Sequence, residues 1–351
     1  MKAAIFHQFQ STIQVQNVAD PTPNTTSAII QVKATGICRS DWHGWMGHDG
    51  DVQLPHVPGH ELAGVIVEVG KEVQQWKKGD RVTVPFACGC GTCVQCSTGN
   101  EHICDNYFQP GFTAWGSFAE YVEIAYADVN LVRLPEAMGF REAAVLGCRF
   151  ITAYRGIVAQ GQLQAKQWIA IHGCGGVGLS AIMIAKALDA NIIAVDIDDT
   201  KLELATQLGA TTILNANQVD DVPAAIQEIT KGGAAVSVDA LGHSQTCLNS
   251  IASLRKRGKH IQIGLMTGPH TAPAIPMPPI IAKELEIIGS HGMQAHQYGE
   301  MFDLIQQQQI PLNKMIGSRL SLEEGAKTLM EMGRFPNLGV MVIDRLSLIH
   351  I

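Results

Sequence analysis

Four cysteines stand at short, regular intervals in one stretch of the chain: Cys90, Cys93, Cys96 and Cys104. Two residues separate successive thiols in the first part of this run, a spacing that lets a tight turn aim two sulfurs at one tetrahedral metal ion. Gly91 and Gly99 would supply the turns. Four thiolates leave no open coordination position, so the pattern predicts a structural zinc that holds a loop. A disulfide pair and an accidental cysteine-rich loop are the alternatives, and Cys88 stands outside the pattern.

Three further residues of zinc-binding types, Cys38, His60 and Cys148, lie far apart in the sequence. Two thiolates and one imidazole would neutralise Zn²⁺ and leave a fourth position for water or substrate, as a catalytic zinc requires. Taken singly, each residue also has a plain structural explanation, the cysteines as small buried side chains and the histidine as a hydrogen-bonded core residue. The residue types alone leave both explanations open.

A glycine-rich run, Gly173-Cys-Gly-Gly-Val-Gly178, follows an apolar stretch at 168–172 and precedes a helical pattern. In that context Gly173 permits a tight turn, Gly175 lets backbone approach a pyrophosphate, and Gly178 allows close packing of the helix on the sheet. Gly176 and Val177 would open the helix, whose N-H groups face the phosphates. Asp196 ends the next predicted strand, where a carboxylate accepts ribose hydroxyls and repels a 2′-phosphate. The run predicts a dinucleotide site that takes NAD rather than NADP.

The periodicity of the chain changes near residue 167. Before it, short apolar or alternating runs broken by Gly and Pro predict a β-rich domain. After it, strands at 168–172, 192–196, 235–238, 261–265 and 285–290 alternate with helices at 177–188 and 199–208. Two more helices are predicted at 297–308 and 322–332. This indicates an α/β protein with a doubly wound parallel sheet at 151–290, inserted into a catalytic domain made of 1–150 and 291–351.

Composition excludes several classes of function. The formal net charge is −7, so nucleic acid and anionic membrane are not expected as partners, and a zinc-ribbon nucleic-acid module is disfavoured. The N-terminus has no apolar signal core and no stretch is long enough for a membrane span, which predicts a cytoplasmic protein. The apolar tail at 346–351 fits either a docked native terminus or an added, non-native end.

Four segments together resemble the zinc-containing medium-chain alcohol dehydrogenases of the medium-chain dehydrogenase/reductase superfamily, and the likeness covers nearly the whole chain. They are Gly36-Ile-Cys-Arg-Ser-Asp41, Gly59-His-Glu61, Gly147-Cys148 and the four-cysteine loop. The resemblance implies a Rossmann domain joined to a GroES-like catalytic domain. It also implies Cys38, His60 and Cys148 as ligands of a catalytic zinc, with Asp41 orienting His60 and Glu61 lying behind the metal.

The same resemblance assigns roles near the substrate and the cofactor. Ser40 stands where the family places a hydroxyl against the substrate oxygen, and His43 where a histidine passes the proton to solvent through the cofactor ribose. Lys201 matches a residue that contacts the adenosine ribose, and Thr152 one that packs on the nicotinamide. A turn hydroxyl and a surface histidine are the plain alternatives for Ser40 and His43.

The resulting prediction is an NAD-linked enzyme with two zinc ions per chain, one catalytic and one structural. It would transfer hydride reversibly between NAD and a primary or secondary alcohol held as an alkoxide on zinc, giving an aldehyde or ketone. The resemblance implies a homo-oligomer, a dimer or tetramer, of which we expect the tetramer. Pocket candidates are Trp42, Trp45, Phe86, Phe112 and Trp115, each equally compatible with ordinary core. A polyol dehydrogenase and a non-catalytic protein that binds NAD and zinc are the alternatives.

Overall fold

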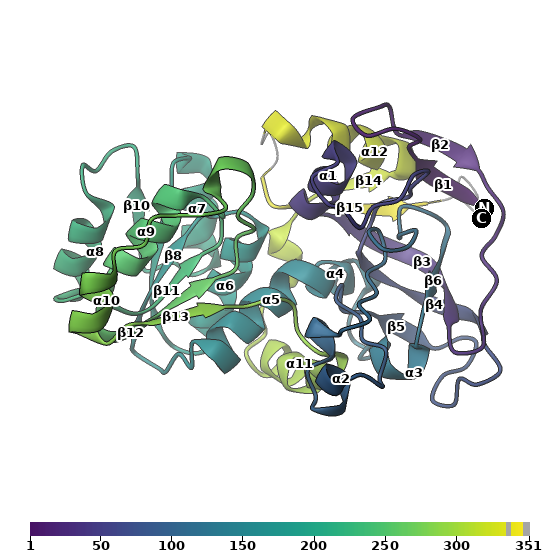
Figure 1. The fold of residues 1–351 in the computed structure, drawn as a ribbon, viewed down its shortest axis with the longest axis horizontal. Coiled ribbons are helices and arrows are strands. Elements are labelled where there is room, and N and C mark those ends of the chain that lie inside the picture. Colours follow the sequence, from purple (N-terminus) through teal and green to yellow (C-terminus); the bar gives the residue numbers. More distant parts are fainter. Residues whose placement is uncertain (335–337, 347–351) are drawn as a thin grey trace. The chain divides into compact units, whose positions relative to one another are not determined.

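The computed structural model describes residues 1–334 and 338–346 (Figure 1). The chain divides into two compact units. Unit 1 contains Met1–Ile151, Gly292–Phe302 and the described residues from Pro311 onward, and unit 2 contains Thr152–His291 and Asp303–Ile310. Residues 347–351 of the apolar tail lie outside the described residues. No helix of the described chain is long and apolar enough to cross a membrane.

Unit 2 is built on six parallel strands. They are β8 (Trp168–His172), β9 (Asn191–Asp196), β10 (Thr212–Asn215), β11 (Ala234–Asp239), β12 (Leu254–Gln262) and β13 (Glu286–Gly289). Their order across the sheet is β10-β9-β8-β11-β12-β13. Counted along the unit this is 3-2-1-4-5-6, the order of dinucleotide-binding sheets, in which ligands bind beyond the carboxyl ends where the order reverses. The predicted doubly wound sheet is confirmed, with its reversal between β8 and β11.

Helices pack against this sheet. They are α6 (Gly176–Ala187), α7 (Asp199–Leu208), α8 (Val222–Thr230), α9 (Ser244–Ala252) and α10 (Met277–Lys283), with shorter helical turns at Arg155–Gln160 and Gly268–His270. Helices α6 and α7 contact each other and β9, whereas α8 and α9 contact each other and β11. Helix α7 begins where predicted because the Asp198 carboxylate accepts hydrogen bonds from the backbone N-H groups of Thr200 and Lys201.

One predicted strand is wrong in its bounds. The apolar run at 261–265 was expected to form it, but β12 covers Leu254–Gln262. The pairing jumps from Ala234 opposite Leu254 to Val236 opposite Lys259, so an irregularity absorbs extra residues, and Arg257 has a positive φ of 58°. The charged side chains at 255–257 are exposed there and do not oppose strand formation. Beyond the strand, Leu265 is 61% exposed.

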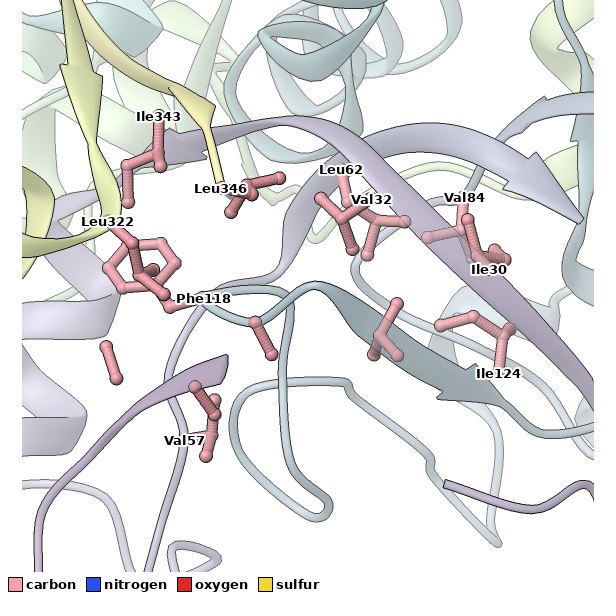
Figure 2. Packing of buried hydrophobic residues seen from close by; sticks show 14 of the residues in the cluster. Ile30, Val32, Val57, Leu62, Val84, Phe118, Ile124, Leu322, Ile343 and Leu346 are labelled. Atoms are coloured by element: carbon pink, nitrogen blue, oxygen red, sulfur yellow. The ribbon is translucent and has the colours of Figure 1, made fainter. Parts of the chain in front are cut away.

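Unit 1 is a largely antiparallel β structure. Its strands are β1 (Lys2–Ile5), β2 (Gln14–Asn17), β3 (Ala28–Ile37), β4 (Glu61–Val69), β5 (Arg81–Thr83), β6 (Tyr121–Ile124), β7 (Val132–Arg133), β14 (Ile316–Ser321) and β15 (Val340–Arg345). One sheet runs β14-β15-β3-β4-β5-β7, with β6 also paired to β3, and β1 pairs with β2. Figure 2 shows the core of this unit, in which Ile30 and Val32 of β3 lie among Leu62, Val84 and Ile124.

Short helices connect these strands. They are α1 (Arg39–Met46), α2 (Val94–Ser97), α3 (Ala127–Asn130), α4 (Phe140–Ala144) and α12 (Leu322–Glu331), with 3-10 turns at Glu101–Ile103, Ala295–Gln297, Leu312–Met315 and Met332–Arg334. A π-helical turn at Leu146–Phe150 leads into α5 (Ile151–Tyr154), and α11 covers Tyr298–Gln307. Strand β3 leads into α1 through the single residue Cys38, so the sheet determines where that thiol lies.

Candidate metal and dinucleotide sites

Strand register brings the predicted catalytic ligands together. Strands β3 and β4 are antiparallel, and Gly36 near the end of β3 stands opposite Glu61 at the start of β4. Cys38 and His60 lie just beyond these paired residues, and the π-helical turn carries Cys148 to the same place. One potential ligand atom from each of four residues lies within 4.8 Å of the others: Cys38, His60, Glu61 and Cys148.

Asp41 holds two of the ligand-bearing segments in place. Its Oδ1 is 2.8 Å from His60 Nδ1 and accepts a hydrogen bond of 3.0 Å from the backbone N-H of Gly59. Its Oδ2 accepts the backbone N-H of Cys38 at 2.8 Å. The carboxylate is 1% exposed, so these contacts form in a poorly solvated place. Burial lowers the pKa of His60, but the Asp41 carboxylate more than offsets it, and the pKa is raised well above its usual value.

The free nitrogen of His60 is the clearest indication of a ligand. Its Nε2 is buried and has no hydrogen-bond partner among the described residues, although Asp41 fixes the ring through Nδ1. A buried polar atom without a partner costs free energy of about 1–3 kcal/mol. An imidazole oriented through one nitrogen and left open at the other is the arrangement of metal-binding histidines. The residues present therefore fit a metal ion.

The two thiols of this cluster interact. Hydrogen bonding from Cys148 lowers the pKa of Cys38 well below its usual value, and the same contact raises the pKa of Cys148. One sulfur is thus favoured as a thiolate, the form that binds metal. Two sulfurs and one nitrogen are the donor types preferred by zinc.

The Glu61 carboxylate is engaged by Arg149, a residue that the sequence reasoning missed. Its Oε1 accepts hydrogen bonds from Arg149 Nε at 2.9 Å and from the Arg149 backbone N-H at 3.1 Å, and its Oε2 contacts Nη2. Burial raises the pKa of Glu61, an effect that Arg149 opposes. Gly36 leaves room for the pair, because a Cβ there would overlap both side chains. The only signal in the sequence was an arginine directly after a predicted ligand.

The predicted relay residues both lie on α1. Ser40 Oγ is 3.5 Å from Cys38 Sγ, which places the hydroxyl beside the cluster. His43 follows three residues later, on the same face of the helix. Its Nδ1 is 3.0 Å from Nδ1 of His48, a residue for which no role was predicted. Burial, then the charges of Arg39 and His48, lowers the pKa of His43 to about 4.

The five aromatic candidates for the pocket lie in different surroundings. Phe86 and Phe112 meet the His60 ring edge-on, with ring centroids 6.1 Å and 5.4 Å away. Trp45 belongs to the hydrophobic core, where its Nε1 donates to Ser11 O. Trp115 is 38% exposed, and Trp42 lies under the Arg39 guanidinium, whose Cζ is 3.9 Å from the ring centroid. Of the five candidates, Phe86 and Phe112 are the two whose rings meet that of His60.

The four-cysteine loop forms a second metal-binding cluster. Its sulfurs all lie within 4.8 Å of one another, and those of Cys93 and Cys104 are 3.6 Å apart. Sulfurs bound to one tetrahedral zinc are about 3.8 Å apart, given Zn–S bonds near 2.3 Å. Gly91 and Gly99 have φ values of 77° and 78°, so both turns use the conformation that glycine favours. Cys88 is apart from this cluster, buried in the core with its Sγ 3.3 Å from Pro85 O.

Backbone N-H groups stabilise charge on these sulfurs. Cys104 Sγ accepts hydrogen bonds from the backbone N-H groups of Cys90 and Asn106 at 3.3 Å and 3.2 Å. Thr92 contacts Cys90 through its hydroxyl at 3.4 Å and its backbone N-H at 3.5 Å, and lowers the pKa of that thiol to about 5. Thiolates supported by N-H donors are suited to hold a metal ion.

The glycine-rich turn of unit 2 has the geometry of a phosphate cradle. Gly173 has a φ of 97°, and a Cβ on Gly178 would overlap the Gly173 carbonyl oxygen. Gly175 is different, because a Cβ there would meet no atom within 4 Å and would extend into open space. Within the described part of the chain no side chain caps α6, so the N-H groups of Gly176 and Val177 can face a ligand. These residues fit a dinucleotide.

Asp196 joins the glycine-rich turn to the end of β9. Its Oδ2 accepts the backbone N-H of Cys174 at 2.7 Å, and its Oδ1 accepts those of Ile197 at 2.8 Å and Asp198 at 3.1 Å. A carboxylate has about four acceptor positions, so one is left for a ribose hydroxyl. Lys201 lies in the first turn of α7, and Thr152 is buried in α5.

Comparisons with known proteins agree with this arrangement. The family described as "Alcohol dehydrogenase GroES-like domain" matches residues 24–136, and "Zinc-binding dehydrogenase" matches residues 176–307. An alcohol dehydrogenase of Geobacillus stearothermophilus is 38% identical over 293 residues, 83% of this chain and 84% of the relative. An NAD-dependent alcohol dehydrogenase of Sulfurisphaera tokodaii is 32% identical over 354 residues, 98% of this chain and 99% of the relative.

A solved structure of an alcohol dehydrogenase has the same fold. Benzyl alcohol dehydrogenase of Acinetobacter calcoaceticus superposes with a TM-score of 0.90 at 27% identity, covering 98% of each chain. A GroES-like domain with a Rossmann domain defines the medium-chain dehydrogenases, and the relatives indicate an oxidoreductase. The chain belongs to the zinc-type alcohol dehydrogenase family of this superfamily.

Proposed function

We propose that the chain is a zinc-dependent, NAD-linked alcohol dehydrogenase that converts primary or secondary alcohols reversibly to aldehydes or ketones. The observation that carries this proposal is the orphaned Nε2 of His60 beside the sulfurs of Cys38 and Cys148. A buried nitrogen with no protein partner, set against two thiols in a family of zinc-binding dehydrogenases, is best accounted for by a catalytic zinc. Cys90, Cys93, Cys96 and Cys104 would hold a second, structural zinc.

The chain's own residues would bind, orient and move a proton. When bound, zinc would supply Lewis acidity that makes an alcohol hydroxyl more acidic, and NAD would supply the acceptor for hydride. Ser40 would accept the hydroxyl proton, and His43 would pass it towards solvent. Phe86 and Phe112 would exclude water from the space beside His60. Asp41 would keep the His60 ring oriented throughout.

The cofactor preference follows from Asp196 and the glycine-rich turn. Gly173 and Gly178 would shape the turn and Gly175 would leave space for the pyrophosphate. The Asp196 carboxylate would accept a ribose hydroxyl and would repel a 2′-phosphate, which favours NAD over NADP. Lys201 and Thr152 would contact the adenosine ribose and the nicotinamide respectively, as the family resemblance implies.

The proposal is tested by measuring NAD and NADP reduction with primary, secondary, aromatic and polyhydric alcohols, together with zinc content by mass spectrometry. We expect NAD-dependent oxidation of monohydric alcohols and two zinc ions per chain. Cys38→Ser should abolish activity and remove one zinc. Cys88→Ser is the matched control, because Cys88 is a buried cysteine outside both clusters, and should keep activity and both ions. Full activity of Cys38→Ser with unchanged zinc would overturn the ligand assignment.

We also propose a cytoplasmic location and a homotetrameric assembly. The nine cysteines are all free of disulfides, which supports a reducing compartment such as the cytoplasm. We expect a homotetramer, and β13 is an edge strand of the unit 2 sheet with Ile287 41% exposed, a surface suited to pairing with another copy. Sedimentation that found only monomers would remove this expectation.

A further inference from the structure

The turn after α1 brings a second histidine onto His43. The backbone N-H of Gly47 donates to Gly44 O at 3.1 Å, and that of His48 donates to His43 O at 3.0 Å. These two bonds form a Schellman motif, in which the second residue past the helix end folds back over the last turn. The motif needs the left-handed conformation of Gly47, whose φ is 78°.

The fold of this turn explains the contact between the two rings. In a Schellman motif the returning residue lies over the residue five positions earlier, and an apolar contact often forms there. Here the two positions are His48 and His43, and their Nδ1 atoms are 3.0 Å apart. Trp42 meets both rings edge-on, with centroids 5.0 Å and 5.7 Å away, which restricts their orientation.

The contact constrains the protons on both rings. A neutral imidazole has one N-H donor and one acceptor nitrogen, so one of the two Nδ1 atoms must carry the proton. His48 is exposed, and an imidazole in water prefers the tautomer protonated at Nε2, which leaves its Nδ1 as the acceptor. His43 must then carry its proton on Nδ1, and its Nε2 is left free to accept another.

We propose that His48 is a positioning residue for the proton relay, which accepts the Nδ1-H of His43 and keeps Nε2 of His43 free to take the alcohol proton. The inference rests on the proposed alcohol oxidation. In that reaction the proton leaves the alcohol oxygen, passes by way of Ser40 to Nε2 of His43, and is released to water, so both rings end neutral. The groups acting on His43 are Arg39 and His48, which disfavour its protonation, and Cys38, which favours it.

His43 is a neutral ring at pH 7. Burial, then the charges of Arg39 and His48, lowers its pKa to about 4. A neutral ring that transmits a proton must be in the correct tautomer, because the other form presents an N-H where an acceptor is needed. A single hydrogen bond to a neighbouring side chain is enough to choose between the two forms.

Three variants separate this role from a structural one. His48→Leu removes the acceptor, whereas His48→Asn keeps an oxygen or nitrogen at the place of Nδ1, and His7→Leu changes an exposed histidine elsewhere in unit 1. We expect His48→Leu to lower kcat for alcohol oxidation at pH 7 by about fivefold, the loss of one hydrogen bond. His48→Asn and His7→Leu should stay within about twofold of the unchanged protein. The deficit of His48→Leu should shrink at high pH, where hydroxide can take the proton directly.

The tautomer itself is measured by NMR on protein with ¹⁵N-labelled histidines, loaded with zinc and free of cofactor. We expect His43 to be protonated at Nδ1 in the unchanged protein and in His48→Asn, and to become a mixture of tautomers in His48→Leu. Protonation of His43 at Nε2 in the unchanged protein would overturn the inference, as would a His48→Leu variant with unchanged kcat. If the unchanged protein oxidised no alcohol, the proposed function would fail, while the NMR spectra would still report on the histidine pair.

Discussion

Removal of Arg149 should lower the free energy of unfolding, because the Glu61 carboxylate is buried and Arg149 is its partner. The two side chains are 8% and 0% exposed, and Arg149 gives Glu61 three N-H groups: two from the guanidinium and one from the backbone. Arg149→Met keeps the backbone donor and much of the side-chain volume but removes both guanidinium donors. A fully buried carboxylate is then left with one of its three hydrogen bonds and without the guanidinium charge.

The size of the effect follows from this loss. Removing one partner of a buried ion pair costs about 3–5 kcal/mol, because the remaining charge stays unsolvated. With a urea dependence of about 2.5 kcal/mol per M, a loss of about 4 kcal/mol lowers the unfolding midpoint by roughly 1.6 M. The double variant Glu61→Gln with Arg149→Met removes the stranded charge and should recover more than half of the loss.

Urea unfolding followed by tryptophan fluorescence measures this prediction, since four of the five tryptophans lie in unit 1. Arg345→Met is the matched control, because Arg345 and its partner Glu324 are 45% and 53% exposed and lie in the same unit. Its loss should cost less than about 1 kcal/mol. Equal losses for the two arginine variants, or a double variant no more stable than Arg149→Met, would refute the reasoning.

Three further predictions concern the cofactor turn, the four-cysteine loop and the choice of cofactor. Gly175→Ala should weaken NAD binding by about tenfold, measured by calorimetry, and leave the unfolding temperature unchanged. Gly178→Ala should weaken NAD binding and also lower the unfolding temperature, because its new Cβ would overlap the backbone of Gly173, whereas a Cβ on Gly175 meets no atom. Equal stability of the two variants would contradict this. Cys90→Ser should reduce the zinc content from two ions per chain to one, while the cluster that contains Cys38 keeps its ion and the protein still oxidises alcohol. An unchanged zinc content would contradict the assignment of a structural zinc. Asp196→Ala should narrow the preference for NAD over NADP by about tenfold in kcat/KM, and an unchanged ratio would place cofactor selection elsewhere.

Much of unit 2 could be predicted from periodicity, because its helices and strands are long and locally encoded. The helix at 199–208 and the strand at 168–172 have the predicted bounds, and the alternation of strands with helices indicated the doubly wound parallel sheet. Strand β12 could not be predicted, because its position depends on pairing with β11 and on an irregularity at Arg257. The pairing of β11 with β12 is set by tertiary structure and leaves no pattern in the local sequence.

The residues of the metal cluster could be named from the sequence because metal chemistry admits few side-chain types. Their meeting point could not be derived, since it depends on the antiparallel register that sets Gly36 opposite Glu61. The partner of Glu61 was missed for the same reason. Arg149 is 88 residues away in the chain, and only the folded sheet and the π-helical turn bring the two charges together.

His48 was missed for a different physical reason. Its contact with His43 is local, only five residues along the chain, and depends on the left-handed Gly47 that closes the Schellman motif. A Gly directly after a short helix indicates such a turn, and the turn determines which side chains come into contact. When a Gly that ends a helix is followed by a titratable residue, the expected partner of that residue therefore lies five positions before it in the chain. Applied to this chain, that rule joins the exposed His48 to the half-buried His43 without any knowledge of the tertiary fold.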